Sequence, residues 1–523
     1  MSGSNSKRKI NLMRMDVPYH ADPTLTFQHI CKNRSATLLL ESAEIASKDN
    51  LKSMMIVDSA VRISAYGKNV EIEALTQNGN VILSYLINNL PDEITFDLKE
   101  FGTKLELKLP TISQELDEDE RLKSTSVFDI LRTISCFDTS NKENTNAIFL
   151  GGLFAYELIN QYEVLPDVEN KNNCPDLCFY LAEVMLFIDH KTKTSYLQSA
   201  LLSNDTAERV RLISRLKQLH DSLNQPLEQI SSVKVERADL NVNFDDETYC
   251  NQVAELQKNI IAGDIFQVVP SRRFSLPCPA PLAAYQTLKG LNPSPYMFYM
   301  QDTLFTLFGA SPESALKYDN ETRQLEIYPI AGTRPRGKNA DGSINLDLDS
   351  RLEFEVRNDH KELSEHIMLV DLARNDLSKV CEPGSRYVAD LTKVDRYSVV
   401  MHLVSRVVGK LRSDLDVLHA YQACMNMGTL TGAPKIRAME LIAKTENTKR
   451  GSYGGAIGYL NSNGDFDTCI VIRSAYVENG TAYVQAGAGV VLDSVPQLEA
   501  DESRAKASAV LTAIKIAHQM QES

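Results

Sequence analysis

Two pairs of glutamates on separate helical segments constrain how this chain can fold. Near the C-terminus, Glu499 and Glu502 lie in a segment rich in helix-forming residues that follows the glycine-rich run 487–491. Far upstream, Glu362 and Glu365 have the same spacing. Residues at i and i+3 share one face of a helix, so each pair forms an acidic patch. If the two helices face each other, the four carboxylates repel one another strongly unless a hard cation such as Mg²⁺ lies between them.

A simpler explanation exists for either pair alone. Most helices on protein surfaces present a charged face to water, and glutamates at this spacing are common there. The metal-site hypothesis therefore depends on the other motifs that the chain carries.

The composition excludes some classes of function. Among the 523 residues there are 55 lysines and arginines against 69 aspartates and glutamates, and the net charge is −14. A chain without a basic field is not expected to bind nucleic acid through its overall charge, so an anionic substrate needs local cations or a metal. The length predicts roughly three domains at about 150 residues each.

The cysteines and the N-terminus predict a cytoplasmic protein. Nine cysteines are scattered, and the close pair Cys174 and Cys178 has no histidine nearby, which favours reduced thiols over disulfides or a zinc site. The basic N-terminus is not followed by an apolar signal segment, and no apolar run is long enough to span a membrane. We therefore expect no contact with a membrane.

Apolar periodicity predicts mixed α and β structure in two regions. Residues 1–20 look like a loosely held tail, and the polar, aperiodic stretch 224–245 looks like a linker. The chain is thereby divided into an N-terminal region, 1–235, and a C-terminal region, 245–520. The runs expected to form strands include 35–42, 53–58, 61–65, 70–74 and 178–188, and those expected to form helices include 206–223 and 246–262.

Several short motifs follow strand ends in the C-terminal region, where loops on a rigid sheet tend to carry functional sites. In chain order they are Gln267, Ser311-Pro-Glu313, Pro329-Ile-Ala-Gly-Thr333, Asp371-Leu-Ala-Arg-Asn-Asp376, Gly428-Thr-Leu-Thr-Gly-Ala-Pro-Lys435, Tyr453-Gly-Gly-Ala and the glycine-rich run with its glutamate helix. Together they resemble the chorismate-utilising enzymes over most of residues 245–515. The resemblance extends more weakly into the N-terminal half, through Leu38-Leu-Leu-Glu41-Ser42 and Gly152-Leu-Phe-Ala-Tyr156.

The resemblance implies an α+β fold of two large antiparallel β-sheets packed face to face, with flanking helices and a site in a cleft at one end. The residue patterns alone support only a mixed α and β class.

The implied reaction adds ammonia at ring C2 of chorismate, removes the C4 hydroxyl and then eliminates pyruvate to give anthranilate. The resemblance implies that Mg²⁺ is held by Glu362, Glu365, Glu499 and Glu502, with Glu365 and Glu502 as the most direct ligands. Such an ion would bind the ring carboxylate and withdraw charge from the ring.

The other site residues are also carried over from the resemblance. Glu313 would protonate the leaving C4 oxygen, which requires that it keep its proton near neutral pH. His402 would serve the later proton transfer with Thr429 beside the ring, although a lone histidine in an apolar stretch is more often a core residue. The substrate-binding residues would be Gly332, Thr333, Tyr453, Arg473, Gly487, Gly489 and Lys506.

Two positions distinguish among the reactions of the family. Gln267 stands where water-adding relatives have a lysine, and glutamine cannot act as a base. Ala331 stands where the para-aminating relatives have a lysine. Both residues favour ortho amination by ammonia.

The resemblance also implies two further ligands. None of the nine cysteines lies in a nucleophile elbow typical of a glutaminase, so a separate glutamine amidotransferase subunit is the expected source of ammonia. A tryptophan feedback pocket is implied by two segments, with the residues Glu41, Ser42, Pro293, Tyr296, Met297 and Phe298.

Three alternatives remain open from the sequence. The nearest is a para-aminating synthase that forms aminodeoxychorismate, and a more distant one is an isochorismate- or salicylate-forming enzyme. The third is a tryptophan-binding regulator without catalytic activity, although the expected acid, metal-binding and carboxylate-binding residues are all present.

Overall fold

The computed structural model describes residues 10–42, 51–137, 146–170, 172–236, 240–397 and 400–520. The helices are α1 Pro23–Cys31, α2 Asn80–Ile87, α3 Glu118–Leu122, α4 Phe128–Ser135, α5 Thr206–Leu223, α6 Asp246–Ile261, α7 Pro281–Leu291, α8 Leu346–Asn358, α9 His360–Ser378, α10 Val417–Cys424, α11 Lys435–Glu446 and α12 Pro496–Ala517, with the 3₁₀ turns η1 Glu100–Gly102, η2 Tyr156–Gln161 and η3 Gly428–Leu430.

The strands are almost all antiparallel neighbours in one hydrogen-bonded network, and β11 pairs separately with β20. In the N-terminal half they are β1 Asn11–Val17, β2 Thr37–Glu41, β3 Lys52–Tyr66, β4 Asn69–Ala74, β5 Thr95–Lys99, β6 Lys104–Lys108, β7 Phe149–Phe154, β8 Leu177–Asp189 and β9 Thr194–Leu201. The remaining strands are β10 Asn241–Val242, β11 Gln267–Val268, β12 Ser271–Pro277, β13 Tyr296–Gln301, β14 Thr306–Ser311, β15 Ser314–Asp319, β16 Gln324–Ile327, β17 Ile330–Pro335, β18 Tyr387–Arg396, β19 Val400–Lys410, β20 Gly432–Ala433, β21 Ala456–Asn461, β22 Phe466–Ile470, β23 Ser474–Glu478 and β24 Thr481–Gly487.

The alternation of side chains along β8 shows how the sheet is layered. Tyr180 and Met185 point into an apolar core that is shared with β2, β7, β13, β14 and β21. On the other face, Phe179 joins a core covered by α2, α4 and α10, whereas Leu186 joins a core covered by α1, α5, α7 and α12. Successive residues of a strand point to opposite faces, and the register shift of β8 against β3 between Ala182 and Val184 reverses which residues point inward. The sheet therefore has an apolar interior between its two halves and helices outside. The α+β fold class is thereby confirmed.

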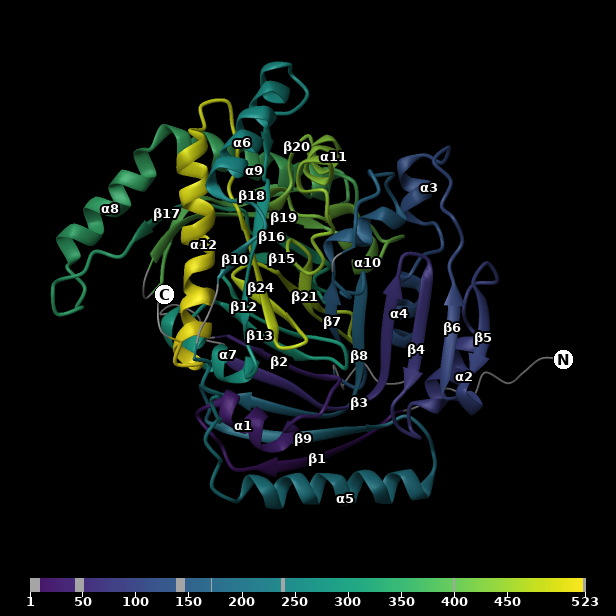
Figure 1. Cartoon of the computed structure of the whole chain (residues 1–523). Helices are drawn as coiled ribbons and strands as arrows, with labels where there is room; N and C mark the ends of the chain where they lie inside the picture. The colour runs from purple at the N-terminus through teal and green to yellow at the C-terminus, as the bar shows by residue number, and fades with distance from the viewer. Residues whose placement is uncertain are drawn as a thin grey trace.

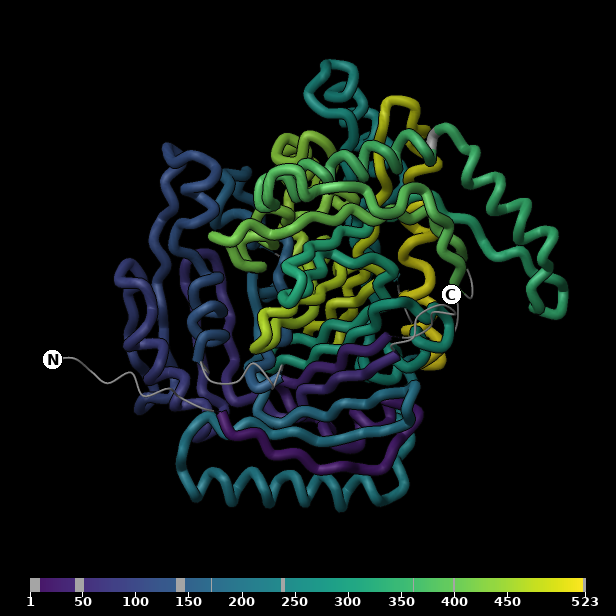
Figure 2. The backbone as a smooth tube through the Cα atoms, turned by 180° about the vertical axis from the view of Figure 1, so that it is seen from behind, coloured from purple at the N-terminus to yellow at the C-terminus, as the bar shows by residue number. Residues whose placement is uncertain are grey.

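The two halves of the chain share this sheet. The strand β2 pairs with β13, with Glu41 opposite Met297, and β7 pairs with β21. Residues on both sides of the expected linker therefore contribute neighbouring strands. Figures 1 and 2 show from opposite sides that α5 covers β1 and β9 at one edge of the molecule.

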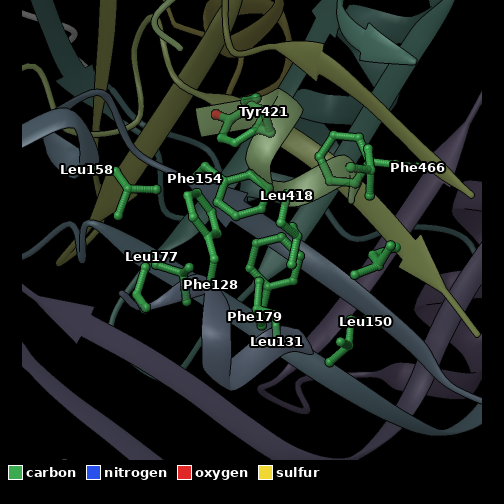
Figure 3. Packing of buried hydrophobic residues seen from close by; sticks show 14 of the residues in the cluster. Phe128, Leu131, Leu150, Phe154, Leu158, Leu177, Phe179, Leu418, Tyr421 and Phe466 are labelled. Carbon is green, nitrogen blue, oxygen red and sulfur yellow. The ribbon is translucent and has the colours of Figure 1, made fainter. Parts of the chain in front are cut away.

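Aromatic rings fill the core on the side of α4 and α10 (Figure 3). The ring of Phe154 lies 4.5 Å from that of Phe179 and 4.4 Å from that of Tyr421, measured between centroids. Phe128 and Phe466 close the cluster from α4 and β22. Buried aromatic residues of this size account for much of the hydrophobic stabilisation of a core.

The N-terminal residues differ from the sequence-based expectation, whereas the helix after the expected linker agrees with it. The expected tail at 1–20 is wrong for residues 11–17, because β1 pairs in register with β9, with Asn11 opposite Leu201. Residues 1–9 lie outside the described part of the chain. The expected helix at 246–262 is confirmed as α6, and Gly263 follows it with a φ of +84°.

Candidate active site

Glu313 lies in the short connection between β14 and β15, and its side chain is only 6% exposed. Burial raises its pKa to about 8. The hydroxyl of Thr429, the charge of Lys506, the backbone N–H of Ile330 and the charge of Arg473 each oppose this rise. The carboxyl therefore holds its proton near neutral pH while cations stand close by, which is the condition that a general acid needs.

His402 faces the same region from β19. It is opposite Thr333 of β17 in the sheet, and the Thr333 Oγ1 lies 3.0 Å from its Nδ1. Burial and the charge of Arg473 lower the pKa of His402 to about 4, although a hydrogen bond from its ring to the backbone carbonyl of Gly332 opposes this. The imidazole is therefore neutral and able to accept a proton.

Arg473 lies in the connection before β23 rather than within a strand, and its φ is +49°. A non-glycine residue in this left-handed region is strained, and such strain tends to occur at functional positions. Burial lowers the pKa of Arg473, and the charges of Tyr453, Glu502 and Glu313 oppose that effect. Tyr453 itself is buried, which raises its pKa to about 12, and the backbone N–H of Gly487 opposes the rise.

The glycine-rich run closely approaches Gln267. A Cβ added to Gly489 would lie 2.7 Å from the Nε2 of Gln267, so a side chain at this position would displace the Gln267 carboxamide. The Oε1 of Gln267 is buried and has no hydrogen-bond partner within the described residues. Lys506 of α12 donates to the carbonyl of Gly487 at 3.1 Å and thereby anchors the start of the run.

The four expected metal ligands come from α9 and α12. Glu362 accepts a hydrogen bond from Arg334 at 3.1 Å, and Glu502 pairs with Lys506 at 2.6 Å. Glu365 is half-buried, whereas Glu499 is 2% exposed. In the described part of the chain, no three histidine, cysteine, aspartate or glutamate side chains lie close enough together to hold a metal ion.

These observations place the expected catalytic and substrate-binding residues in one neighbourhood. Glu313 is linked to Thr429, Lys506 and Arg473, and Arg473 in turn is linked to His402 and Tyr453. The roles of these residues stay predictions.

Arg450 is a site residue that the sequence did not reveal. Its guanidinium donates to the carbonyls of Leu430 at 2.8 Å and Val269 at 2.7 Å, and it lies over the ring of Tyr453 at 5.5 Å from the centroid. It is buried and paired with Glu446. Arg450 therefore connects the backbone segments that carry Thr429 and Gln267. In the sequence, the only indication that Arg450 belongs to the site is its nearness to Tyr453.

The segments of the expected tryptophan pocket are also adjacent. The carboxylate of Glu41 is buried and accepts hydrogen bonds from Tyr285 at 2.5 Å and Lys289 at 2.6 Å. On the neighbouring β13, Tyr296 donates to Asp467 at 3.1 Å. Met297 and Phe298 of β13 are buried, whereas Ser42 and Pro293 are half-buried near the strand ends.

No helix in the described residues is both long enough and apolar enough to cross a membrane.

Comparison with known proteins gives the family. A family model described as chorismate binding enzyme matches residues 95–512. Anthranilate synthase component 1 of Escherichia coli (strain K12) is 59% identical over 516 residues, which covers 99% of this chain and 99% of that protein. The protein of the same name from Vibrio cholerae is 56% identical over 514 residues, covering 98% of each chain.

A solved structure agrees with these sequence relatives. The crystal structure of anthranilate synthase component I from Streptococcus pneumoniae TIGR4 superposes with a TM-score of 0.68 at 27% identity, covering 94% of this chain and 98% of that one. The chain therefore belongs to the chorismate binding enzyme family, and it is an enzyme of the anthranilate synthase component 1 type.

Proposed function

We propose that this site converts chorismate and ammonia into anthranilate, pyruvate and water, with Mg²⁺ as cofactor and ammonia supplied by a glutamine amidotransferase subunit. The observation that carries the proposal is the buried carboxyl of Glu313, whose pKa is raised to about 8. A protonated carboxyl can give its proton to the C4 oxygen as the hydroxyl leaves, whereas a carboxylate cannot.

The substrate is a dianion, and the cations around Glu313 suit it. Arg473 can bind the enolpyruvyl carboxylate through two N–H groups, and Tyr453 can donate its hydroxyl to the same group because its raised pKa keeps it protonated. Lys506 adds a second positive charge next to the backbone of Gly487. These donors can orient chorismate so that C4 faces Glu313.

Gln267 favours ammonia over water as the nucleophile. Its carboxamide cannot remove a proton from water, so it cannot generate hydroxide. Its buried Oε1 lacks a partner within the described residues and can therefore accept an N–H of ammonia. After addition, the neutral imidazole of His402 can take the ring proton whose loss gives the aromatic product.

The donor chemistry of α9 and α12 suits Mg²⁺. Carboxylate oxygens are the ligands that this ion prefers, and it commonly keeps water or substrate oxygens in its shell, so the protein need not supply a complete cage. Glu362, Glu365, Glu499 and Glu502 would hold the ion, although Glu362 and Glu502 are engaged by Arg334 and Lys506 and must exchange partners. The bound ion would supply Lewis-acid polarisation of the ring carboxylate.

Replacing Glu502 by glutamine is expected to weaken Mg²⁺ binding by at least tenfold, because a charged ligand is lost. Isothermal titration of the chain with Mg²⁺ and chorismate measures this directly, and turnover at rising Mg²⁺ gives a second readout. Asp501→Asn is the matched control, since Asp501 lies on the same helix and is half-exposed beside Arg504. Equal Mg²⁺ affinity in the two variants would remove Glu502 from the metal site.

A second subunit follows from the chemistry of ammonia and from the names of the relatives. At neutral pH most ammonia is ammonium, which is not a nucleophile, so a protected supply is an advantage. The relatives are called component 1, and that name implies a second component. We infer that the second component hydrolyses glutamine.

Tryptophan feedback would act through the buried contact between β2 and β13. Inhibition at a distance requires two packings of the molecule that bind tryptophan differently. The ion pair between Glu41 and Lys289, 2.6 Å apart, is a group that a bound amino acid could displace or stabilise.

The variant Ser42→Phe is expected to keep most of its activity but to lose inhibition by tryptophan, because the new ring fills the space next to Glu41. Inhibition curves with and without tryptophan test this. Ser84→Phe on the exposed side of α2 provides a control for a new aromatic ring on the N-terminal half. Unchanged inhibition of Ser42→Phe would place the tryptophan pocket elsewhere.

One incubation tests the reaction itself. The purified chain is mixed with chorismate, Mg²⁺ and a high concentration of ammonium salt, and the products are separated by chromatography. Anthranilate with equimolar pyruvate supports the proposal. Isochorismate, salicylate, a para-amino product or unchanged chorismate would each contradict it.

A further inference from the structure

Glu157 is a buried carboxylate to which the reaction assigns no role. It lies in η2, directly after the motif at 152–156 of the N-terminal half, and the residue is 6% exposed. One of its carboxylate oxygens accepts the backbone N–H of Arg450 at 2.6 Å, and the other accepts the backbone N–H of Gly451 at 2.8 Å. Glu157 therefore joins the N-terminal half to the segment that carries Tyr453.

The segment 448–455 is an irregular turn that is built against the N-terminal half. Gly451 has a φ of +66°, a conformation that favours glycine, and its carbonyl accepts the backbone N–H of Tyr156 at 2.9 Å. A Cβ added to Gly455 would lie 2.1 Å from the carbonyl oxygen of Phe154. The shape of the turn therefore depends on groups at the end of β7 and the start of η2.

The same turn places Tyr453 in the site. The guanidinium of Arg450 lies 4.7 Å from the ring centroid of Tyr156 and 5.5 Å from that of Tyr453. The hydroxyl of Tyr453 meets the backbone N–H of Gly487. Because Tyr453 follows Gly451 by only two residues, a shift of the backbone that Glu157 holds would move this hydroxyl away from its place beside Gly487.

We propose that Glu157 is a positioning residue for chorismate binding. By fixing two consecutive N–H groups, it holds the Tyr453 hydroxyl where it can meet the enolpyruvyl carboxylate. A carboxylate offers an acceptor oxygen to each N–H, whereas glutamine has one acceptor oxygen and an NH₂ group that would face a second donor. One buried N–H would then be left without a partner. The inference rests on the proposed binding of chorismate by Tyr453.

Glu157→Gln is expected to raise the Kd for chorismate by about tenfold or more, since a hydrogen bond to a charged group usually contributes at least that much. The enolpyruvyl carboxylate keeps its own bonds throughout the reaction, so its contact with Tyr453 is similar in the ground state and the transition state. The KM for chorismate should therefore rise with the Kd, while kcat changes by less than about threefold.

Isothermal titration with chorismate in the absence of ammonia measures the Kd, and steady-state kinetics with ammonium measure KM and kcat. Burial raises the pKa of Glu157 to about 7, against the effect of the hydrogen bonds from Arg450 and Gly451. The variants are therefore compared at pH 8, where the carboxyl of the unsubstituted chain is mainly ionised.

Asp176→Asn is the matched control. Asp176 is also 6% exposed, and its carboxylate accepts the backbone N–H of Gly67 at 2.6 Å, in the turn between β3 and β4. Each substitution removes one buried carboxylate that holds a turn, and urea unfolding measures what each costs in stability. The control should leave the Kd for chorismate unchanged. An equal rise in the control would overturn the proposal, because the loss of any buried carboxylate would then weaken binding.

A double variant tests whether Glu157 acts through Tyr453. Tyr453→Phe removes the hydroxyl, so the position of the turn should then matter little for chorismate. Adding Glu157→Gln to Tyr453→Phe should raise the Kd by less than about twofold, because two changes in one pathway are not additive. Effects that multiply would contradict action through the hydroxyl.

Glu157→Asp provides a second variant that keeps both acceptor oxygens but withdraws them by one methylene. It should raise the Kd for chorismate less than Glu157→Gln does, and it decides the question if the glutamine variant does not fold. If the unsubstituted chain neither binds chorismate nor forms anthranilate, the proposed function fails. If it does both and the Kd is unchanged in the folded Glu157 variants, only the positioning role fails.

Discussion

Glu313→Gln should lower kcat for anthranilate formation by about 10²- to 10⁴-fold, the usual contribution of a general acid. Glutamine has nearly the same shape as glutamate, but its amide cannot protonate the leaving C4 oxygen. Steady-state kinetics with chorismate and ammonium measure the loss. Glu321→Gln, an exposed change in the turn after β15, is the matched control and should leave kcat unchanged. A loss of less than about tenfold would mean that another group supplies the proton.

The pH dependence of the unsubstituted enzyme gives an independent check. Glu313 must be protonated to act, so kcat should be constant at low pH and should fall as pH rises through about 8, the pKa that burial produces. Rates must be compared at constant free ammonia, because the neutral fraction of ammonia increases over the same range. In Glu313→Gln this decline should be absent.

The substitution Glu313→Gln should also increase the free energy of unfolding at neutral pH. The folded pKa of Glu313 is raised from 4.5 to about 8, so the folded state binds one more proton than the unfolded state between these values. The free energy of unfolding therefore decreases as pH rises through this window, by up to about 3 kcal/mol at pH 7. Glutamine has no carboxyl to ionise, so the variant should not lose stability between pH 5 and pH 7. Urea unfolding of the variant and of the unsubstituted chain at these two pH values measures the difference. Such a gain would mean that the acid is kept at the expense of stability.

Local patterns predicted much of the fold. The helix expected at 206–223 is α5 with the same bounds, because its apolar spacing repeats over several turns. The strands expected at 53–58 and 61–65 are one strand, β3. Its pairing with β8 shifts register between Ile56 and Val61, and such an irregularity interrupts the alternation that identifies a strand. The strand β1 was missed although Met13, Met15 and Val17 alternate with polar residues, because the run is short and none of its residues is fully buried.

The site was predictable only where a motif marks it. Glu313 and Thr429 stand in recognisable loops, but the cause of the raised pKa of Glu313 is burial, which depends on the packing of distant segments. Arg450 shows the same limit more clearly. Its partners Val269, Leu430 and Glu446 are brought together only by the sheet and α11, and a single arginine among polar residues gives no sign of burial.

Arg450→Met should destabilise the chain by about 3–5 kcal/mol, because it leaves the carboxylate of Glu446 buried without its cation. Glu446 and Arg450 are each 3% exposed, and their closest atoms are 2.5 Å apart. Total stabilities are usually about 5–15 kcal/mol, so the loss is a large fraction and should be evident in urea unfolding. Arg504→Met is the matched control, since Arg504 is half-exposed beside Asp501 and should cost less than about 1 kcal/mol.

The double variant Glu446→Met, Arg450→Met separates the ion pair from the other contacts of Arg450. Removing both charges eliminates the unpaired carboxylate, so the double variant should be more stable than Arg450→Met alone. It should nevertheless stay less active than the unsubstituted enzyme, because the carbonyls of Val269 and Leu430 have lost the donor that fixes the backbones next to Gln267 and Thr429. If the double variant regained full activity, Arg450 would serve only to neutralise Glu446. If activity stayed low despite recovered stability, the backbone contacts of Arg450, together with the hydrogen bonds that Glu446 accepts from Ser271, position the residues that act on chorismate.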